Sequence, residues 1–216
     1  RPQPSAHLAP RAATTVNCAP MFFWIENLAA ALGVLSVWLM ARQKPIAWPI
    51  GFFMVVLYAI VFFEAKLFSA SLLQIIYARL QAYGWWCWLR GAKAQALPVT
   101  ILAMPCVLRD LAVGALITLA LGSFMHLHTD AQMPWLDATL TGLSLVGQYW
   151  MAHKRLQCWP LWLVVDVAYV GMFWAAGLVT TTLLYVGFIG LAVYGWRQWS
   201  MAMAQNTVLP LPKAAP

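Results

Sequence analysis

The chain has 216 residues, of which 63% are hydrophobic and only 9% are charged, and its mean hydropathy is +0.74. Because soluble domains carry about 25% charged residues, this composition excludes a soluble globule and predicts an all-α membrane protein. The net charge of +7 would elsewhere suggest nucleic acid, but the basic residues lie in short loops between apolar runs. We therefore interpret the charge as a signal of membrane topology and expect no nucleic-acid partner.

Both ends of the chain differ in composition from the middle. Residues 1–20 are rich in proline and alanine and have no apolar core of the kind that a signal peptide requires. We expect them to form a flexible tail, followed by a single transmembrane domain over residues 21–203 and a second tail over residues 204–216. Four scattered cysteines without a CxxC pair argue against a disulfide framework or a metal site: Cys18, Cys87, Cys106 and Cys158.

Seven apolar stretches approach the length of about 20 residues that a helix needs to cross the hydrocarbon core of a bilayer. They cover residues 24–42, 47–65, 68–90, 106–127, 135–153, 158–176 and 180–202. The chain is therefore predicted to form seven transmembrane helices.

An internal repeat organises these spans. Residues 48–88 recur 111 residues later, at 159–199, without a gap, and the register continues backwards through the preceding span. The repeats thus cover residues 24–90 and 135–202, and the span 106–127 belongs to neither. Because one odd helix separates them, the two three-helix repeats should be parallel, in a 3+1+3 arrangement. Residues that match between the copies include Trp48 and Trp159, Tyr58 and Tyr169, Gly84 and Gly195, and Trp88 and Trp199.

The basic residues are unequally divided between the two ends of the predicted spans. The positive-inside rule then predicts an external N-terminus and a cytoplasmic C-terminus. Arg79 lies in the middle of the third span, where a charge should face the protein interior, a water-filled cavity or the interface. One side receives Arg42, Lys44, Arg90, Lys93, Arg109, Lys154, Arg155, Arg197 and Lys213, and the other receives Arg1, Arg11 and Lys66.

No catalytic constellation is visible, so we do not expect an enzyme or a bound cofactor. The GxSxG and HExxH motifs are absent, and no pair of intramembrane aspartates occurs. His126, His128 and Asp130 lie together near the end of the fourth span, and we interpret them as exposed loop polarity rather than as a metal site.

Polar residues that occur in only one copy of the repeat indicate a functional site. Asp166 stands where the first copy has Val55, and an ionisable group at that depth predicts a functional role. The alternative is an ion pair between Asp166 and Arg79 that merely closes the bundle. Two further polar positions are Gln148, which replaces Val37, and Tyr185, which stands opposite Gln74.

Aromatic residues accompany Asp166 along its helix. Trp162 lies four residues before it and Tyr169 three residues after it, so the three side chains share one helical face. An aromatic slot with a carboxylate suits a flat cationic ligand, because ring faces attract positive charge. The alternative is an aromatic packing stripe or an interfacial belt.

The two repeats resemble the Pnu vitamin transporter family, which includes the PnuC nicotinamide riboside transporters. The resemblance covers residues 24–199 and rests on YGWWCW after an LLQ helix, on the neighbourhood of Gln148, and on WPLWLVVD with a downstream YGWRQW. It implies a homotrimer in a bacterial inner membrane that takes up its vitamin by facilitated diffusion. A cytoplasmic kinase would trap the vitamin, without ion coupling or an ATP site.

The resemblance favours nicotinamide riboside as the cargo, with thiamine or another vitamin as the alternative. The position of Asp166 carries Asn in some members of the family, so an acid there suits a cation but does not choose between pyridinium and thiazolium. A seven-helix receptor or sensor is the competing class, and the 3+1+3 duplication argues against it. The residues predicted to bind the substrate are Asp166, Gln148, Trp162, Tyr169, Gln74, Trp85 and Tyr185.

Overall fold

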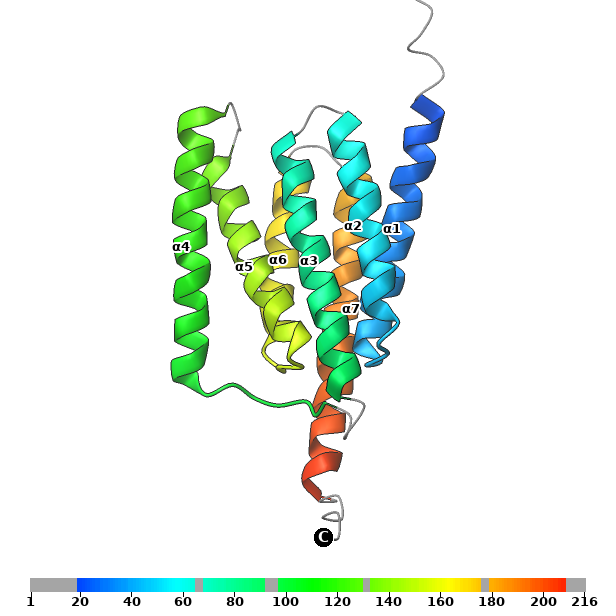
Figure 1. Cartoon of the computed structure of the whole chain (residues 1–216), viewed down its shortest axis with the longest axis vertical. Coiled ribbons are helices and arrows are strands. Elements are labelled where there is room, and N and C mark those ends of the chain that lie inside the picture. Colours follow the sequence, from blue (N-terminus) through cyan, green and yellow to red (C-terminus); the bar gives the residue numbers. More distant parts are fainter. Residues whose placement is uncertain (1–18, 65–67, 92–96, 130–132, 176–178, 209–216) are drawn as a thin grey trace, which may run out of the picture.

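The structure is a computed structural model that describes residues 19–64, 68–91, 97–129, 133–175 and 179–208. In these segments the chain forms seven α-helices and no β-sheet (Figure 1), which confirms the predicted all-α membrane fold. Each helix coincides with one predicted span to within a few residues. The helices are α1 (Ala19–Ala41), α2 (Ala47–Glu64), α3 (Phe68–Gly91), α4 (Met104–His128), α5 (Pro134–Ala152), α6 (Cys158–Ala175) and α7 (Val179–Val208).

The helix ends differ from the prediction at both termini. Helix α1 begins at Ala19, inside the segment 1–20 that we expected to be a tail, and α7 continues to Val208, beyond residue 203. The predicted limits followed the apolar run, whereas Met, Ala and Gln residues after position 200 are good helix formers without being a continuous apolar run. Residues 1–18 and 209–216 lie outside the described residues, as do five residues used to predict the orientation: Arg1, Arg11, Lys66, Lys93 and Lys213.

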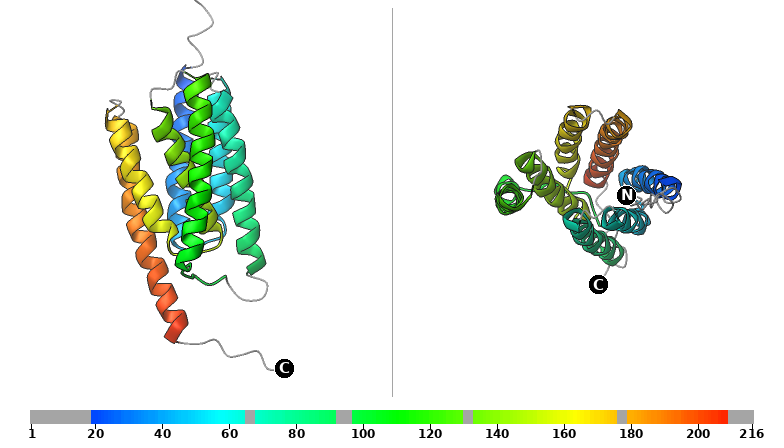
Figure 2. Two further views of the ribbon diagram at one scale, coloured as in Figure 1. Left: turned by 90° about the vertical axis from the view of Figure 1, so that its left-hand side faces the viewer. Right: turned by 90° about the horizontal axis from the view of Figure 1, so that it is seen from above.

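Six helices close into a ring, and α4 stands outside it. Around the ring α1 packs on α2, α2 on α3, α3 on α5, α5 on α6, α6 on α7, and α7 on α1, and the view along the helices in Figure 2 shows this order. The first helix of each repeat thus contacts the third helix of the other repeat. Among the described helices, α4 packs only on α5.

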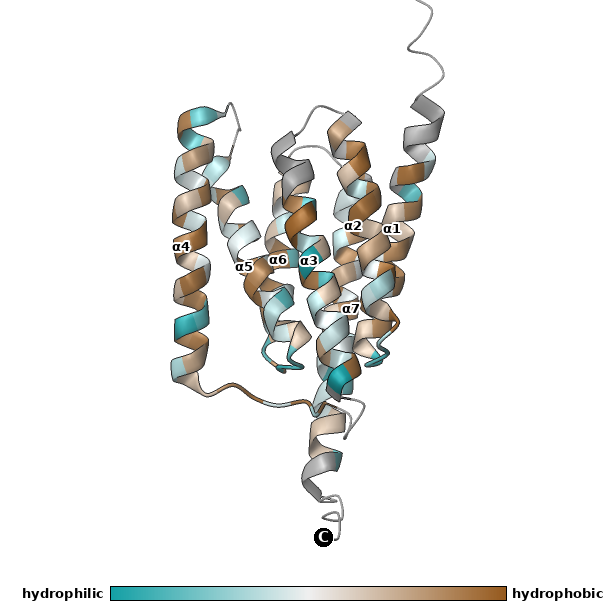
Figure 3. Ribbon diagram, viewed as in Figure 1, coloured by the Kyte–Doolittle hydropathy of each residue, from teal (hydrophilic) through white to brown (hydrophobic). Residues whose placement is uncertain are grey.

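The outer surface of the bundle is apolar, as a surface in contact with lipid tails must be. On α4 the side chains of Leu108, Leu116 and Leu127 are 61%, 65% and 73% exposed. Hydrophobic residues predominate along this helix in Figure 3, apart from polar stretches near both of its ends. Helices α4 and α6 are long and apolar enough to cross a bilayer by themselves, judged over the described residues.

Four buried tryptophans that contact one another belong to the core at the end of the bundle where the α1–α2 and α5–α6 loops lie. Their side chains are at most 3% exposed. The ring centroids of Trp48 and Trp88 are 5.5 Å apart and those of Trp159 and Trp199 are 5.3 Å apart, both in edge-to-face geometry. Trp88 and Trp199 then meet across the two repeats at 6.1 Å. We call Trp48, Trp88, Trp159 and Trp199 the tryptophan cluster.

The tryptophan cluster makes two reciprocal hydrogen bonds between the repeats. Nε1 of Trp88 donates to the carbonyl oxygen of Met151 at 3.3 Å, and Nε1 of Trp199 donates to that of Met40 at 3.2 Å. Donors and acceptors are both related by the 111-residue repeat interval, so each repeat makes the same bond to the other. These bonds connect α3 to α5 and α7 to α1.

Glycines allow the outer members of the tryptophan cluster to lie against the third helix of their own repeat. A Cβ atom on Gly84 would stand 2.1 Å from the ring of Trp48, and a Cβ atom on Gly195 would stand 2.4 Å from the ring of Trp159. No side chain fits at either position. The indoles therefore hold the second and third helices of each repeat together.

We expect Gly195→Ala to lower the free energy of unfolding by about 1–3 kcal/mol, because overpacking a filled interior forces the backbone or the Trp159 ring to move. Gly187→Ala on the same helix is the matched control, since its Cβ would meet no atom within 4 Å. Thermal unfolding of both purified variants in detergent measures the effect. Equal unfolding temperatures for the two variants would show that this glycine contact does not matter to stability.

Candidate binding cavity

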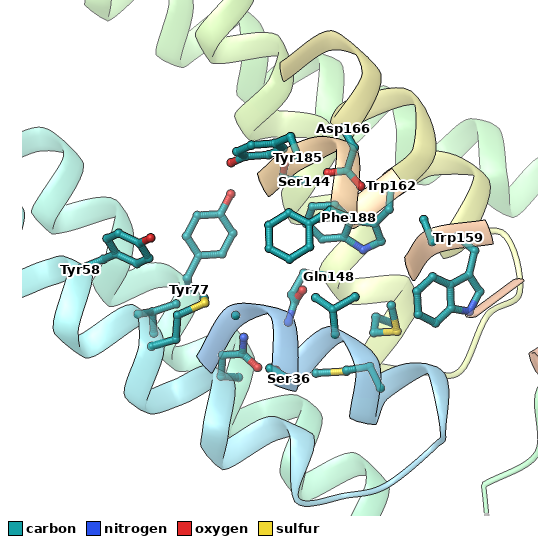
Figure 4. Close-up of a pocket in the computed structure, with 18 of the residues that line it drawn as sticks. Ser36, Tyr58, Tyr77, Ser144, Gln148, Trp159, Trp162, Asp166, Tyr185 and Phe188 are labelled. Atoms are coloured by element: carbon teal, nitrogen blue, oxygen red, sulfur yellow. The ribbon is translucent and has the colours of Figure 1, made fainter. Parts of the chain in front are cut away.

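A cavity of about 280 Å³ lies inside the ring of six helices. Each of the six contributes side chains to its wall, and none of the lining residues comes from α4. Figure 4 shows that both repeats face the cavity. The lining residues are Gly33, Ser36, Val37, Met40, Met54, Val55, Tyr58, Gln74, Tyr77, Gln81, Ser144, Gln148, Met151, Trp159, Trp162, Asp166, Tyr185, Phe188 and Ala192.

Asp166 is the acidic residue of the cavity wall. Its side chain is 5% exposed, and Figure 4 shows its carboxyl group beside Trp162 and near Tyr185. It has no hydrogen-bond or ion-pair partner within the described part of the chain, where the ion pair that does form joins Arg109 to Asp110. Arg79 is exposed on the outside of α3. The ion pair between Asp166 and Arg79, which was the alternative role for Asp166, is therefore not formed in this structure.

Trp162 is positioned by a glycine on the neighbouring helix α5. A Cβ atom on Gly147 would lie 3.3 Å from Cε2 and Nε1 of the Trp162 indole, so the missing side chain leaves room for the ring beside the cavity. In the first repeat the position of Trp162 is taken by Gly51, and the amide of Gln81 fills that space, 2.6 Å from a Cβ atom built on Gly51. The two repeats thus line the cavity with an indole on one side and an amide on the other.

Tyr185 belongs to a group of aromatic rings that contact one another in tilted and edge-to-face geometries. Its ring centroid lies 4.8 Å from that of Tyr169, 5.2 Å from that of Phe173 and 5.6 Å from that of Phe188. Tyr185 and Phe188 line the cavity, whereas Tyr169 and Phe173 do not. Tyr169 therefore supports the cavity wall through Tyr185 in this structure.

The structure brings together five of the seven residues that we predicted to bind the substrate. Trp85 lies elsewhere, on the outside of α3, with 42% of its side chain exposed. The reason is helical geometry, since the preceding Gly84 faces Trp48 and the next residue is turned about 100° away. Tyr169 stands behind the wall. The five that line the cavity are Gln74, Gln148, Trp162, Asp166 and Tyr185.

Several of the polar residues that line the cavity were not predicted from the sequence. The two copies of the repeat were compared at a few positions only, where one copy has a charged or large polar side chain. Ser144 aligns with Gly33, and Gln81 aligns with Ala192, so the same comparison contained the signal. Gln81 Oε1 and Gln148 Nε2 are both buried without a hydrogen-bond partner in the described structure. Buried amide atoms normally have a partner, so a ligand or water must be expected at these groups. The missed polar residues are Ser36, Tyr58, Tyr77, Gln81 and Ser144.

A central cavity enclosed by lipid-facing helices, with a buried carboxyl group and unpaired amides on its wall, defines the protein as a membrane transporter of small molecules. The family model of the nicotinamide mononucleotide transporter matches residues 23–201. The chain belongs to this family. Its relatives are transporters and not enzymes.

Individual relatives agree with this assignment. The chain is 28% identical over 203 residues to the nicotinamide riboside transporter PnuC of Escherichia coli (strain K12), covering 82% of this chain and 84% of the relative. It is 26% identical over 203 residues to the riboflavin/roseoflavin transporter RibM of Streptomyces davaonensis, covering 89% and 92%. The crystal structure of the vitamin B3 transporter PnuC superposes with a TM-score of 0.68 at 25% identity, covering 87% of both chains. The resemblance to a PnuC-like transporter is thereby confirmed.

We expect Asp166→Asn to leave the thermal unfolding temperature unchanged or to raise it, because the carboxyl group is buried without a partner and the amide has the same shape. Asp110→Asn is the matched control. The Asp110 carboxylate accepts hydrogen bonds from Nε1 of Trp150 and Nη2 of Arg109, both at 2.8 Å, so its loss should destabilise the fold by about 1.5–3 kcal/mol. A larger loss of stability for Asp166→Asn than for Asp110→Asn would restore the structural interpretation of Asp166.

Proposed function

We propose that this protein carries nicotinamide riboside across a bacterial inner membrane by facilitated diffusion. The observation that supports this best is the Asp166 carboxyl group, which is buried beside an indole in a cavity whose described wall has no lysine, arginine or histidine. A buried carboxylate gains most from a ligand with a positive charge, because that charge offsets its lost hydration. The pyridinium ring of nicotinamide riboside is flat and cationic.

The wall of the cavity also suits the uncharged parts of such a ligand. Aromatic rings of Trp162, Tyr185 and Phe188 offer faces that attract a cationic ring. Serine hydroxyls and glutamine amides offer hydrogen bonds to the hydroxyl groups of a sugar and to an amide. A volume of about 280 Å³ is near the lower limit of small-molecule pockets, about 300 Å³, which favours a ligand no larger than a nucleoside.

The same arguments disfavour the mononucleotide that appears in the description of the family. A phosphate group would bring about two negative charges into a cavity that already holds a carboxyl group and has no described basic side chain to pair with it. Like charges in a water-poor cavity repel strongly. We therefore propose the riboside, and not the phosphorylated form, as the cargo.

Thiamine is the second candidate, because its thiazolium ring is also flat and cationic and meets the same carboxyl group. Riboflavin, which the RibM relative carries by its name, has a neutral and larger ring system that gains nothing from the charge of Asp166. We rank these cargoes below nicotinamide riboside. Direct titration of the purified protein with all three vitamins separates them.

Direction and energetics complete the proposal. The described cavity wall holds one carboxyl group and no second acidic or basic side chain to form a proton relay with it. We propose that substrate equilibrates across the membrane and that a cytoplasmic kinase traps it by phosphorylation. We further propose a homotrimer of 3+1+3 protomers with parallel repeats, an external N-terminus and a cytoplasmic C-terminus.

We expect Asp166→Ala to weaken the binding of nicotinamide riboside about ten- to hundredfold, because a charge-assisted contact is worth about 1.5–3 kcal/mol. Isothermal titration of the folded variant measures this loss. Asp137→Ala is the matched control, since Asp137 lies in the first turn of α5 and does not line the cavity. Unchanged affinity for nicotinamide riboside and for thiamine in a well-folded Asp166→Ala protein would place the site elsewhere.

We also expect purified protein in liposomes to exchange labelled nicotinamide riboside by counterflow at a rate that an imposed proton or sodium gradient does not change. The physical reason is that a facilitator has no coupling ion whose movement could drive the substrate. Nicotinamide mononucleotide outside the liposomes should not compete. Accumulation of substrate above equilibrium in response to either gradient would refute facilitated diffusion while leaving the binding site untouched.

A further inference from the structure

The cavity is closed at the end where the α1–α2 and α5–α6 loops lie, which we call the loop face. Met40, Met151 and Ala192 form the wall at that end and are at most 4% exposed. Beyond them lies the tryptophan cluster, and no member of it is more than 3% exposed. A ligand in the cavity therefore has no open route to the loop face in this structure.

The two loops that cover the tryptophan cluster have the same backbone geometry. Gln43 and Lys154 are 111 residues apart, and both adopt left-handed backbone angles, with φ of 57° and 49°. The backbone nitrogen of Gln43 donates to the carbonyl oxygen of Met40 at 2.9 Å, and that of Lys154 donates to Met151 at 3.1 Å. Corresponding turns thus present one side chain from each loop at the same place.

These two side chains bond to each other. Nζ of Lys154 donates to Oε1 of Gln43 at 3.0 Å and lies 4.7 Å from the ring centroid of Trp88. Lys154 is only 6% exposed, and its burial lowers the pKa of the ammonium group to about 8. The amide of Gln43 and the indole face of Trp88 are the groups that compensate this buried charge.

We propose that these contacts form a clasp that shuts the transport pathway at the loop face and must separate for the ligand to pass. The clasp consists of the Gln43–Lys154 hydrogen bond and the two reciprocal bonds of Trp88 and Trp199. The proposal rests on the transport function proposed above. It names residues that control passage without touching the ligand, since Gln43, Lys154, Trp88 and Trp199 do not line the cavity.

The contacts at the loop face are of two kinds, those within one repeat and those between the two repeats, and this difference explains why the clasp should open. The Trp48–Gly84 and Trp159–Gly195 contacts lie within a repeat and are too tight to admit a methyl group. The clasp bonds all run between the repeats, and they are three single hydrogen bonds. A further, exposed bond at this end joins the Tyr83 hydroxyl to Nε2 of His153 at 3.2 Å and also runs between the repeats. If each repeat rotates as a rigid unit, the bonds that break are those of the clasp together with this exposed one.

A cysteine reporter tests the proposal without any ligand. Ala192→Cys places a thiol on the cavity wall, in a protein whose four native cysteines have been replaced by serine or alanine. A membrane-impermeant maleimide is added to intact cells and to inverted membrane vesicles. A separate Lys44→Cys protein, with its thiol on an exposed loop residue, identifies which preparation presents the loop face.

We expect Lys154→Met to speed labelling of the Ala192→Cys thiol from the loop face about fivefold, the change that corresponds to one lost hydrogen bond. Trp88→Phe removes a different clasp bond and should act in the same direction. The affinity for nicotinamide riboside should stay within about twofold. Labelling that is unchanged in both variants, with unfolding temperatures at the level of the parent protein, would overturn the clasp.

Arg155→Met is the matched control, because Arg155 lies next to Lys154 in the same loop but bonds elsewhere. Its Nη1 donates to Oγ1 of Thr100 at 2.6 Å, and none of the hydrogen bonds of Arg155 in the described structure joins the two repeats. It should leave labelling unchanged, and equal acceleration by Arg155→Met would also overturn the proposal. Because labelling needs no substrate, the clasp is tested even if the cargo is not nicotinamide riboside.

Discussion

The reciprocal hydrogen bonds of Trp88 and Trp199 are the constraint on which the arrangement of the bundle depends. Each bond joins the third helix of one repeat to the first helix of the other, at 3.3 and 3.2 Å, and both bonds are buried. While these bonds are formed, α1 is held to α7 and α5 is held to α3, and the six helices form a closed ring. The cavity lies at the centre of this ring, and all six helices of the ring contribute to its wall.

A symmetric frame of this kind carries an asymmetric cavity wall. Val55 and Gly51 in the first repeat correspond to Asp166 and Trp162 in the second, so the carboxyl group and the indole rings of the wall lie on the side of the second repeat. The size of the side chains at two pairs of corresponding positions compensates. In the first repeat the large Gln81 fills the space beside Gly51, and in the second repeat the counterpart of Gln81 is the small Ala192, while the counterpart of Gly51 is the large Trp162. The residues that the two repeats share thus build the symmetric helix bundle, and the residues in which they differ give the cavity wall two unlike sides, as an asymmetric ligand requires.

The sequence predicted the seven helices and five of the nineteen residues that line the cavity, because the repeat and the apolar runs are signals that the sequence itself carries. Asp166 and Gln148 were visible as polar residues at membrane depth. Trp85 was misplaced because its neighbour Gly84 already occupies the inward direction, and only packing shows which of two adjacent residues faces the core. Tyr77 and Ser36 were missed because a tyrosine or serine in an apolar span has no distinctive pattern until its facing helix is known.

The buried polar atoms without a hydrogen-bond partner indicate which groups a bound ligand could pair with. The Nε1 atoms of Trp88 and Trp199 are hydrogen-bonded, whereas those of Trp48 and Trp159 are buried without a partner in the described structure. Of these two rings, Trp159 lines the cavity and Trp48 does not. Gln81 and Gln148 each hold one further unpaired atom. Unpaired polar groups in an apolar interior each cost about 1–3 kcal/mol. Groups of this kind lie along the cavity wall, and a polar ligand that pairs with them recovers part of that free energy on binding.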